Sequence, residues 1–378
     1  MIFCTLSGAN RINNQKLVFF LFEKNEWYVL CEERTFDMAA NANLHKAKNA
    51  KNDEFYTQLT DVAKELMHYK QHFKDKIVFC NCDDPTWSAF WKYFHLNFEA
   101  LGLKKLISTH YDKTEPTYKM EYTGGDDNDI EVGVKTPLEG NGDFRNQECL
   151  DLLDEADIVV TNPPFSLFRE YVACLMEHKK KFVIWGNNNA ITYKEFFPLL
   201  KDNKVWLGYI ANQTCVFRLS DEYAKWDEKI TNQMNDGHKY GKCPAISVFT
   251  NLDIQKRHEK LILWRNYTSE EYPTYDNYDA INVDKVDYIP CNYYGVMGVP
   301  ITFLDKYNPE QFEIIGMSAS ADTMDIPVQL GETFMKEYRR QGGTGHFSAN
   351  MYGVCYFDSK GRAKVPYGRI LIRKKAGA

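Results

Sequence analysis

A short turn directly after an apolar run carries the side chains best suited to chemistry in this chain. The run 156–160 leads through Thr161 into Asn162-Pro163-Pro164-Phe165. Each proline fixes φ and lacks a backbone N–H, so the Pro163 carbonyl and the Asn162 amide oxygen can both accept hydrogen bonds from one nitrogen. Phe165 can stack on a planar ring. The turn therefore indicates methylation of the exocyclic amine of a planar base, and a Pro-Pro strand end with a packed Phe is the structural alternative.

Two further segments place acceptor side chains where strands are expected to end. Cys80-Asn81-Cys82-Asp83-Asp84-Pro85 follows an apolar run, and Gly142-Asp143-Phe144 stands in a loop. Ionised carboxylates only accept hydrogen bonds, which suits a ribose hydroxyl or an adenine amine. Taken singly, Asp-Asp-Pro is also a common helix start and Gly-Asp a common turn. The glycine-rich dinucleotide fingerprint and the phosphate-cradling loop do not occur, so neither NAD nor ATP is favoured.

Alternating helix and strand patterns must position these segments. Helical spacing is expected over 61–72, 86–98, 168–177 and 193–200, and apolar strands over 76–82, 104–110, 157–161, 181–185 and 204–209. This order predicts a doubly wound, mostly parallel α/β sheet, in which ligands bind at the carboxyl ends of the strands. After Leu219 the chain changes to short strands and loops, which predicts a mixed α+β C-terminal region with a basic tail over 362–375.

Composition limits the class of protein. The 378 residues are 44% hydrophobic and 26% charged, which is typical of a globular chain and not of a disordered one. With a net charge of −6, any nucleic-acid contact must come from a local basic face. The ten cysteines form no CxxC pair and no zinc-spaced cluster, so we expect reduced thiols, a cytoplasmic location and no metal site. The apolar run 17–22 is too short to span a bilayer and is expected to pair with 27–31 as a hairpin.

The chain resembles the EcoRI-type adenine-specific DNA methyltransferases. The matching segments run from Leu44 to about Ile315 and again over the tail from Pro366, through 44–48, 53–58, 80–85, 157–168, 275–283 and 295–304. The resemblance implies a class I methyltransferase with a Rossmann-like fold that uses S-adenosylmethionine. Chains of this family begin near the position of Met38, and the resemblance fades between Met317 and Val365, which leaves open an insertion near the DNA-facing end.

The resemblance also assigns roles to single residues. It implies catalysis by Asn162, Pro163, Pro164 and Phe165, and cofactor binding by Phe55, Tyr56 and Thr57, by the loop residues Cys80, Asn81, Cys82, Asp83, Asp84 and Pro85, and by Asp143 and Phe144. The cofactor loop usually carries glycines in this family, whereas this chain has none there. Base flipping would bring the target adenine out of the duplex to the Asn162 turn.

Three parts are expected along the chain. They are an N-terminal extension over 1–37 that is dispensable, an S-adenosylmethionine-binding catalytic core over 38–220, and the remaining sheet edge with a DNA-recognition region over 221–378. Candidate phosphate contacts are Lys46, Lys48, Lys51, Arg339 and Arg340, with solvated surface charge as the alternative. The implied partners are duplex DNA, with GAATTC as a family-based expectation for the site, and a cognate restriction endonuclease that shares that site. We expect a monomer that binds no membrane.

Two other functions stay open at this stage. Asn-Pro-Pro-aromatic turns suit any planar amine or amide, so a ribosomal RNA base or a protein glutamine could be the methyl acceptor. A nucleic-acid-binding module with a decayed methylase fold is the non-enzymatic alternative, and the intact turn and Asp143 loop argue against it. Methylation of a cytosine ring carbon is disfavoured, because the pair Cys243-Pro244 has the reverse of the order that this reaction needs.

Overall fold

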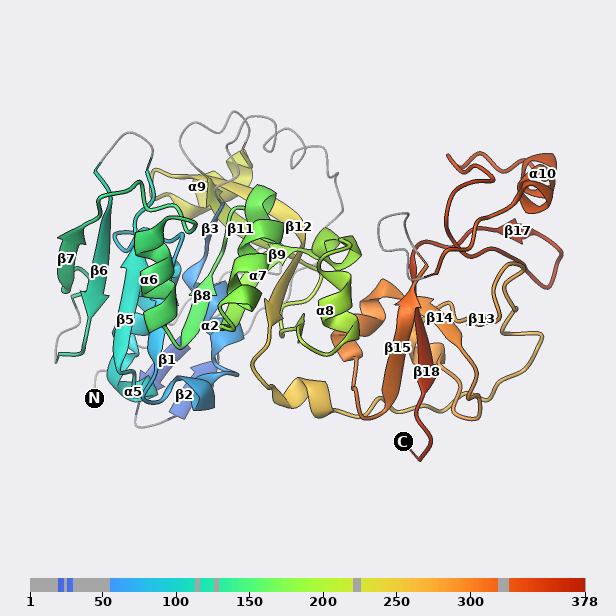
Figure 1. Ribbon diagram of the computed structural model, residues 1–378, viewed down its shortest axis with the longest axis horizontal. Helices are drawn as coiled ribbons and strands as arrows, with labels where there is room; N and C mark the ends of the chain where they lie inside the picture. The colour runs from blue at the N-terminus through green and yellow to red at the C-terminus, as the bar shows by residue number, and fades with distance from the viewer. Residues whose placement is uncertain are drawn as a thin grey trace, which may run out of the picture.

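The computed structural model describes residues 20–23, 26–29, 55–112, 116–125, 129–219, 226–318 and 326–377. These residues form two lobes that lie side by side, a larger one around an extended sheet and a smaller one at the C-terminal end (Figure 1). The expected α/β architecture with a large sheet is confirmed. None of the helices in these ranges is long and apolar enough to cross a membrane.

The large sheet has ten described strands. Its path is β3 (Phe55–Thr57), β11 (Gln213–Leu219), β12 (Lys239–Thr250), β9 (Lys181–Asn187), β8 (Ile158–Thr161), β4 (Ile77–Cys80), β5 (Lys105–Thr109), β6 (Tyr118–Tyr122) and β7 (Val134–Pro137), with β10 (Trp206–Leu207) beside β12. Only the four central strands, β9, β8, β4 and β5, pair in parallel. All other pairings are antiparallel, so the sheet is mixed rather than mostly parallel.

Helices cover both faces of the central strands. Successive residues of a strand point to opposite faces, so each central strand contributes side chains to two cores. Ile77 and Phe79 of β4 enter one core cluster, whereas Val78 and Cys80 enter the other. The helices of the large lobe are α2 (Leu59–Leu66), α3 (Lys70–Phe73), α4 (Ala89–Leu96), α5 (Phe98–Leu101), α6 (Gln147–Glu155), α7 (Phe168–Glu177), α8 (Phe197–Lys201) and α9 (Glu228–Met234), with 3₁₀ turns η1 (Phe165–Leu167) and η2 (Asn188–Thr192).

The structure differs locally from several of the expected elements. The helix expected over 61–72 divides into α2 and α3. The helix expected over 193–200 shortens to α8, which has Pro198 in its first turn, where a missing N–H is tolerated. The expected strand over 204–209 keeps only the two residues of β10. In contrast, α7 has the bounds that the sequence predicts.

The smaller lobe is built on a four-stranded sheet in the order β13 (Ile281–Asn282), β14 (Met297–Pro300), β18 (Arg369–Lys374) and β15 (Phe312–Met317). It also holds β16 (Tyr356–Phe357), β17 (Ala363–Lys364), α10 (Glu332–Arg340) and the turns η3 (Gln255–His258), η4 (Val286–Tyr288) and η5 (Ile301–Lys306). Buried residues of both lobes belong to one hydrophobic cluster. The lobes therefore share a core.

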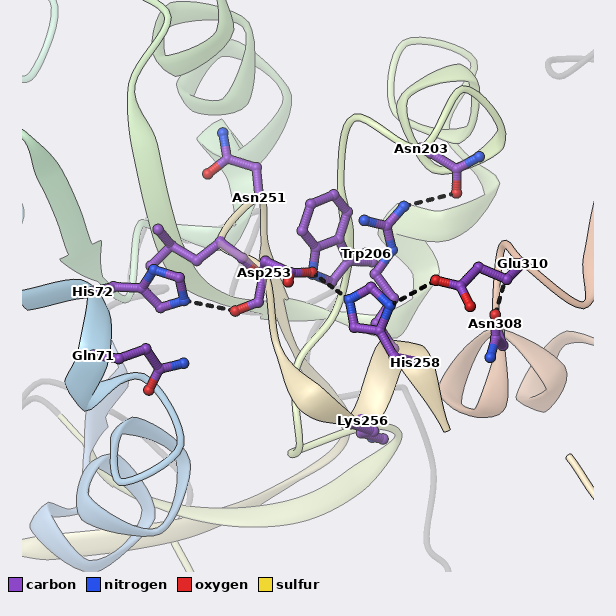
Figure 2. A network of polar contacts seen from close by, with 12 residues as sticks. Gln71, His72, Asn203, Trp206, Asn251, Asp253, Lys256, His258, Asn308 and Glu310 are labelled. Carbon is purple, nitrogen blue, oxygen red and sulfur yellow. Dashed lines mark hydrogen bonds and ion pairs between the residues drawn. The ribbon is translucent and has the colours of Figure 1, made fainter. Parts of the chain in front are cut away.

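The segment that joins the lobes is held on both sides by polar contacts (Figure 2). His258 lies 2.8 Å from Asp253 through Nε2 and 3.2 Å from Glu310 through Nδ1. His72 Nε2 lies 2.6 Å from the Asp253 carbonyl. The Arg257 guanidinium packs over the Trp206 ring, 3.7 Å from its centroid. These contacts fix the connection between the two sheets.

The expected N-terminal hairpin is present in the described residues. β1 (Phe20–Glu23) pairs antiparallel with β2 (Glu26–Val29), with Phe22 opposite Trp27. The hairpin confirms the expected pairing for 20–22 of the apolar run, whereas 17–19 and 30–31 lie outside the described residues. Its relation to the remainder of the sequence before Phe55 lies outside the described residues.

Candidate active site

The loops after β4, β5 and β8 meet at the carboxyl ends of the parallel strands. Thr161, the last residue of β8, contacts the Asn81 carbonyl through its hydroxyl. Ser108 of β5 donates to the Cys80 carbonyl at 3.0 Å and also contacts the Asp83 carbonyl. These side-chain bonds replace strand pairing where the strands separate, and they fix the start of each loop.

The Asn162 turn leaves β8 at this point. Pro163 is buried, while Asn162, Pro164 and Phe165 are half-buried. η1 begins at Phe165, directly before α7, so the turn is short and bounded on both sides by regular structure. The Phe165 ring meets Phe217 of β11 edge to face, with ring centroids 6.5 Å apart.

Asp83 and Asp84 are adjacent in sequence but lie in opposite electrostatic environments. Burial raises the pKa of Asp83 to about 7, although its hydrogen bonds from Thr161, Ser88 and the Asn162 backbone work against the shift. Burial also opposes ionisation of Asp84, but hydrogen bonds from several donors outweigh it and hold the pKa of that carboxyl below its usual range. Asp84 is therefore ionised at neutral pH, whereas Asp83 titrates there.

The donors to Asp84 come from three parts of the site. Its Oδ1 accepts from the Thr86 backbone at 2.9 Å and from the Tyr118 hydroxyl at 2.9 Å. His110, just after β5, places Nδ1 3.0 Å from Oδ2. Asp84 thus holds the loop 80–85 against the ends of β5 and β6 from within the protein.

The remaining residues of this loop are mostly internal. Cys80 is fully buried, and burial raises the pKa of its thiol well above its usual value. The Asn81 amide oxygen accepts from the Tyr171 hydroxyl at 2.7 Å. Pro85 is buried. Cys82 adopts a left-handed conformation with φ of 68°, which favours glycine, so the chain makes the expected turn without a glycine.

The Asp143 loop lies against the same site. Gly142 has φ of 74°, and a Cβ there would lie 2.2 Å from the His110 carbonyl, so only glycine allows this approach. Asp143 forms a bidentate pair with Arg145, at 2.9 and 2.7 Å, which lowers its pKa. Phe144 is buried and meets the Tyr171 ring edge to face at 5.0 Å. Tyr171 therefore contacts both Phe144 of the Asp143 loop and Asn81, and it links these two segments.

β3 brings the first expected cofactor segment to this region. It pairs antiparallel with β11, which places Thr57 opposite Phe217. The Tyr56 ring contacts Trp87, two residues after the loop 80–85, with centroids 4.0 Å apart. Thr57 is buried, and its hydroxyl has no hydrogen-bond partner within the described part of the chain. Phe55 is the first residue of the strand.

The candidate DNA contacts divide into two groups. Lys46, Lys48 and Lys51 lie outside the described residues. Arg339 donates to the carbonyls of the loop after α10, to Gly343 at 2.6 Å and to Gly345 and Phe347 at 2.8 Å each, and Arg340 pairs with Glu337. Both side chains are exposed but already bound within the protein.

Several residues of the site escaped the sequence analysis. Ser88 caps α4 by accepting from the Phe90 and Trp91 backbones at 3.1 and 3.2 Å, and it also donates to Asp83. Its position before a helix was a readable N-cap signal. Thr161 and Tyr171 had no such signal, because their roles depend on contacts about eighty to ninety residues distant along the chain.

Comparison with known proteins shows the family to which this chain belongs. The model of the family described as "Adenine-specific methyltransferase EcoRI" matches residues 43–375. The chain belongs to this family. It is 46% identical over 305 residues to the type II methyltransferase M.EcoRI of Escherichia coli, covering 77% of this chain and 93% of the relative. It is also 42% identical over 279 residues to M.MpnI of Mycoplasma pneumoniae, covering 73% and 86%.

Family membership confirms the predicted class of enzyme, a site-specific, adenine-specific DNA methyltransferase of the restriction-modification type. The family match also covers 317–365, the stretch in which we expected the resemblance to fade. No solved structure gives a significant match. Within the described residues, no group of three or more His, Cys, Asp or Glu side chains could hold a metal ion.

Proposed function

We propose that this methyltransferase transfers a methyl group from S-adenosylmethionine to the exocyclic amine of an adenine flipped out of duplex DNA. The observation that carries this proposal is the Asn162 turn, which is anchored where β8 ends and lies beside the loops of β4 and β5. We further propose that the enzyme is monomeric and cytoplasmic and that a restriction endonuclease shares its DNA recognition site. GAATTC is the first sequence to test as that site. The division into 1–37, 38–220 and 221–378 is part of the same proposal.

The residues around the loops fit the proposed methyl donor. S-adenosylmethionine, when bound, supplies an electrophilic methyl group on a positively charged sulfur. We assign its binding to Phe55, Tyr56 and Thr57, to the loop from Cys80 to Pro85, and to Asp143 and Phe144. The buried Thr57 hydroxyl supports this assignment, because a buried polar atom without a protein partner within the described residues is a natural contact for a ligand.

The Asn162 turn accounts for the chemistry on the adenine side. The lone pair of the adenine amine is delocalised into the ring, so this nitrogen is a poor nucleophile in its planar form. Acceptors at the Asn162 side chain and the Pro163 carbonyl favour the pyramidal form that develops as the methyl group arrives. They therefore stabilise the transition state more than the ground state.

Phe165 is proposed to stack on the flipped adenine. It is half-buried, and its contact with Phe217 supports the ring from one edge. Replacing Phe165 with alanine should cost about 1–3 kcal/mol of base stacking and lower methyl transfer more than DNA binding. The measurement is the fluorescence of 2-aminopurine at the target position. An unchanged signal in the variant would contradict the stacking role, and Phe165→Tyr is the matched control that keeps a ring.

The part of the smaller lobe around α10 is proposed to face DNA. Residues 326–368 carry six Lys and Arg against three acidic residues, in a chain with a net charge of −6. This local excess of positive charge is what a nucleic-acid contact requires. α10 and α9 both lie on the upper side of the molecule in Figure 1. Phe217 of β11 contacts Phe165 of the Asn162 turn, and α9 is the next helix after β11. The proposed active site therefore lies on the same side of the molecule as α9 and α10.

Arg339 should act on DNA through the loop that it holds. Its guanidinium faces carbonyl groups, and a Cβ on Gly343 would lie 2.3 Å from the Tyr338 ring, so this loop is closely built. Arg339→Ala should weaken DNA binding roughly 10-fold, because a loosened loop must be ordered again on binding. The salt dependence should stay nearly unchanged. A fall of about one in the slope of log K against log salt would identify a direct phosphate contact instead. Arg340→Gln is the control.

The proposed function is tested by incubating the protein with radiolabelled S-adenosylmethionine and one of three acceptors. Duplex DNA, ribosomal RNA and peptide release factor should be compared at equal concentration. Label in duplex DNA alone, as N6-methyladenine, is the expected result. Label in RNA or in the release factor would show a different acceptor, and no label in any of the three would indicate a binding protein without activity. Sequencing of modified bases in plasmid DNA from an expressing strain then gives the recognition site.

A further inference from the structure

The carboxyl group of Asp83 connects the loop after β4 to the Asn162 turn. It accepts hydrogen bonds from the Thr161 hydroxyl, from the Asn162 backbone N–H and, at 3.2 Å, from Ser88. We propose that Asp83 is a positioning residue for methyl transfer, whose ionised carboxylate holds Thr161 and Asn162 and thereby sets the orientation of the Asn162 amide. The inference rests on the proposed function, and for Asp83 it replaces the direct cofactor contact that the family resemblance implies.

The hydroxyl of Thr161 makes this connection sensitive to protonation. It lies against two acceptors, the Asn81 carbonyl and Asp83 Oδ2, but it has a single proton to donate. When Asp83 is ionised, Thr161 donates to the carboxylate. When Asp83 is protonated, it can donate to Thr161, which then donates to Asn81. Protonation therefore changes the hydrogen bonding of the residue that directly precedes Asn162.

The groups around Asp83 allow both arrangements near neutral pH. Burial raises the pKa of Asp83 to about 7, and the charge of neighbouring Asp84 adds to the shift. The thiol of Cys80 on β4 and the phenol of Tyr171 on α7 also face it, and burial raises the pKa of both well above their usual values, so they stay neutral. His110 faces Asp84 and holds that carboxylate in its ionised form. The hydrogen bond to Asp84 raises the pKa of the His110 imidazole above its usual value, so Asp83 and His110 are the two groups of this cluster that can change charge in the tested pH range, and Asp83→Asn removes the contribution of Asp83 alone.

The test is the pH profile of Asp83→Asn, an isosteric variant that cannot ionise. Single-turnover rates on duplex DNA and the Kd for S-adenosylmethionine should be measured from about pH 6 to about pH 9. The wild-type rate should rise with pH through about 7. The variant should be about 10- to 100-fold slower and show no step, because a small misplacement of a reacting group has effects of this size. Its Kd for the cofactor should change by less than about 3-fold.

Two outcomes would overturn the inference. One is a wild-type rate without a step near pH 7, or the same step in the variant. The other is a large loss of cofactor binding with an unchanged rate at saturating cofactor, which would return Asp83 to the cofactor site. If wild-type protein fails to methylate duplex DNA at all, the proposed function is wrong, and that result is separate from either outcome.

Substitutions at Thr161 provide an independent test if Asp83→Asn does not fold. Thr161→Val removes the hydroxyl and should remove the pH step, whereas Thr161→Ser keeps the hydroxyl and should keep the step. Stability gives a readout that needs no activity. Unfolded Asp83 loses its proton near 3.8 and folded Asp83 near 7, so folding takes up a proton between these values. The Asp83 contribution to stability therefore falls as pH rises across this window, and Asp83→Asn should lack this fall.

Discussion

Asn162→Ala is expected to reduce the rate of methyl transfer by at least about 10²-fold, while the Kd for S-adenosylmethionine stays nearly unchanged. The amide oxygen acts on the adenine amine as it becomes pyramidal, so its loss raises the barrier without removing a cofactor contact. The turn itself should persist, since Pro163 and Pro164 fix its backbone and Asp83 binds the Asn162 backbone N–H, which the alanine variant keeps. Single-turnover kinetics and calorimetric titration of the cofactor measure the two quantities separately.

Asn162→Asp is the matched control for this experiment. It keeps an acceptor oxygen in the same position, replaces the NH₂ group by a second oxygen and adds a negative charge. It should retain more activity than Asn162→Ala. Wild-type turnover in the alanine variant would show that the assigned mechanism is wrong, and equal loss in both variants would show that an acceptor oxygen at this position is not sufficient.

Glu65→Ala should have the largest effect on stability. Glu65 is completely buried in α2, where its carboxyl group accepts from the Tyr69 hydroxyl at 2.7 Å and from the backbones of Tyr209 and Ile210 at 2.8 and 2.6 Å. A Cβ on Gly208 would lie 2.2 Å from the carboxyl oxygen, so the chain passes directly over it. The alanine variant leaves these donors unsatisfied and should lower the free energy of unfolding by about 3–5 kcal/mol. Denaturant titration measures this loss.

Glu65→Gln separates hydrogen bonding from charge. Its amide oxygen can still accept from the Tyr209 and Ile210 backbones, so it should lose much less stability than Glu65→Ala. Burial raises the pKa of Glu65, which means that ionisation of this group in the fold is unfavourable. The deficit of the glutamine variant relative to wild type should therefore shrink as pH rises, because only wild type loses stability on ionisation. An equal loss in both variants at every pH would contradict this assignment.

The sequence alone determined the local elements that carry the chemistry. Two prolines after an apolar β-branched run end a strand whatever surrounds it, so the turn at Asn162 was predictable, as was α7 directly after it. The hairpin of β1 and β2 followed in the same way from apolar runs close in sequence. Extended similarity to known methyltransferases gave the class of enzyme. All of these signals lie within short windows of the chain.

Only the tertiary structure decided which partners each polar group found. The antiparallel flanks of the sheet could not be predicted, because strand direction depends on pairings between distant segments such as β3 and β11. Asp83 and Asp84 look equivalent in sequence and are both half-buried, yet desolvation raises the pKa of Asp83, which contacts Thr161, whereas hydrogen bonds from His110 and its neighbours lower the pKa of Asp84. Arg339 was predicted as a phosphate contact, and the fold adds hydrogen bonds to the carbonyls of the loop after α10, which no local pattern indicated. Burial and hydrogen-bond partners set the charge of a side chain, and both arise only when the chain is folded.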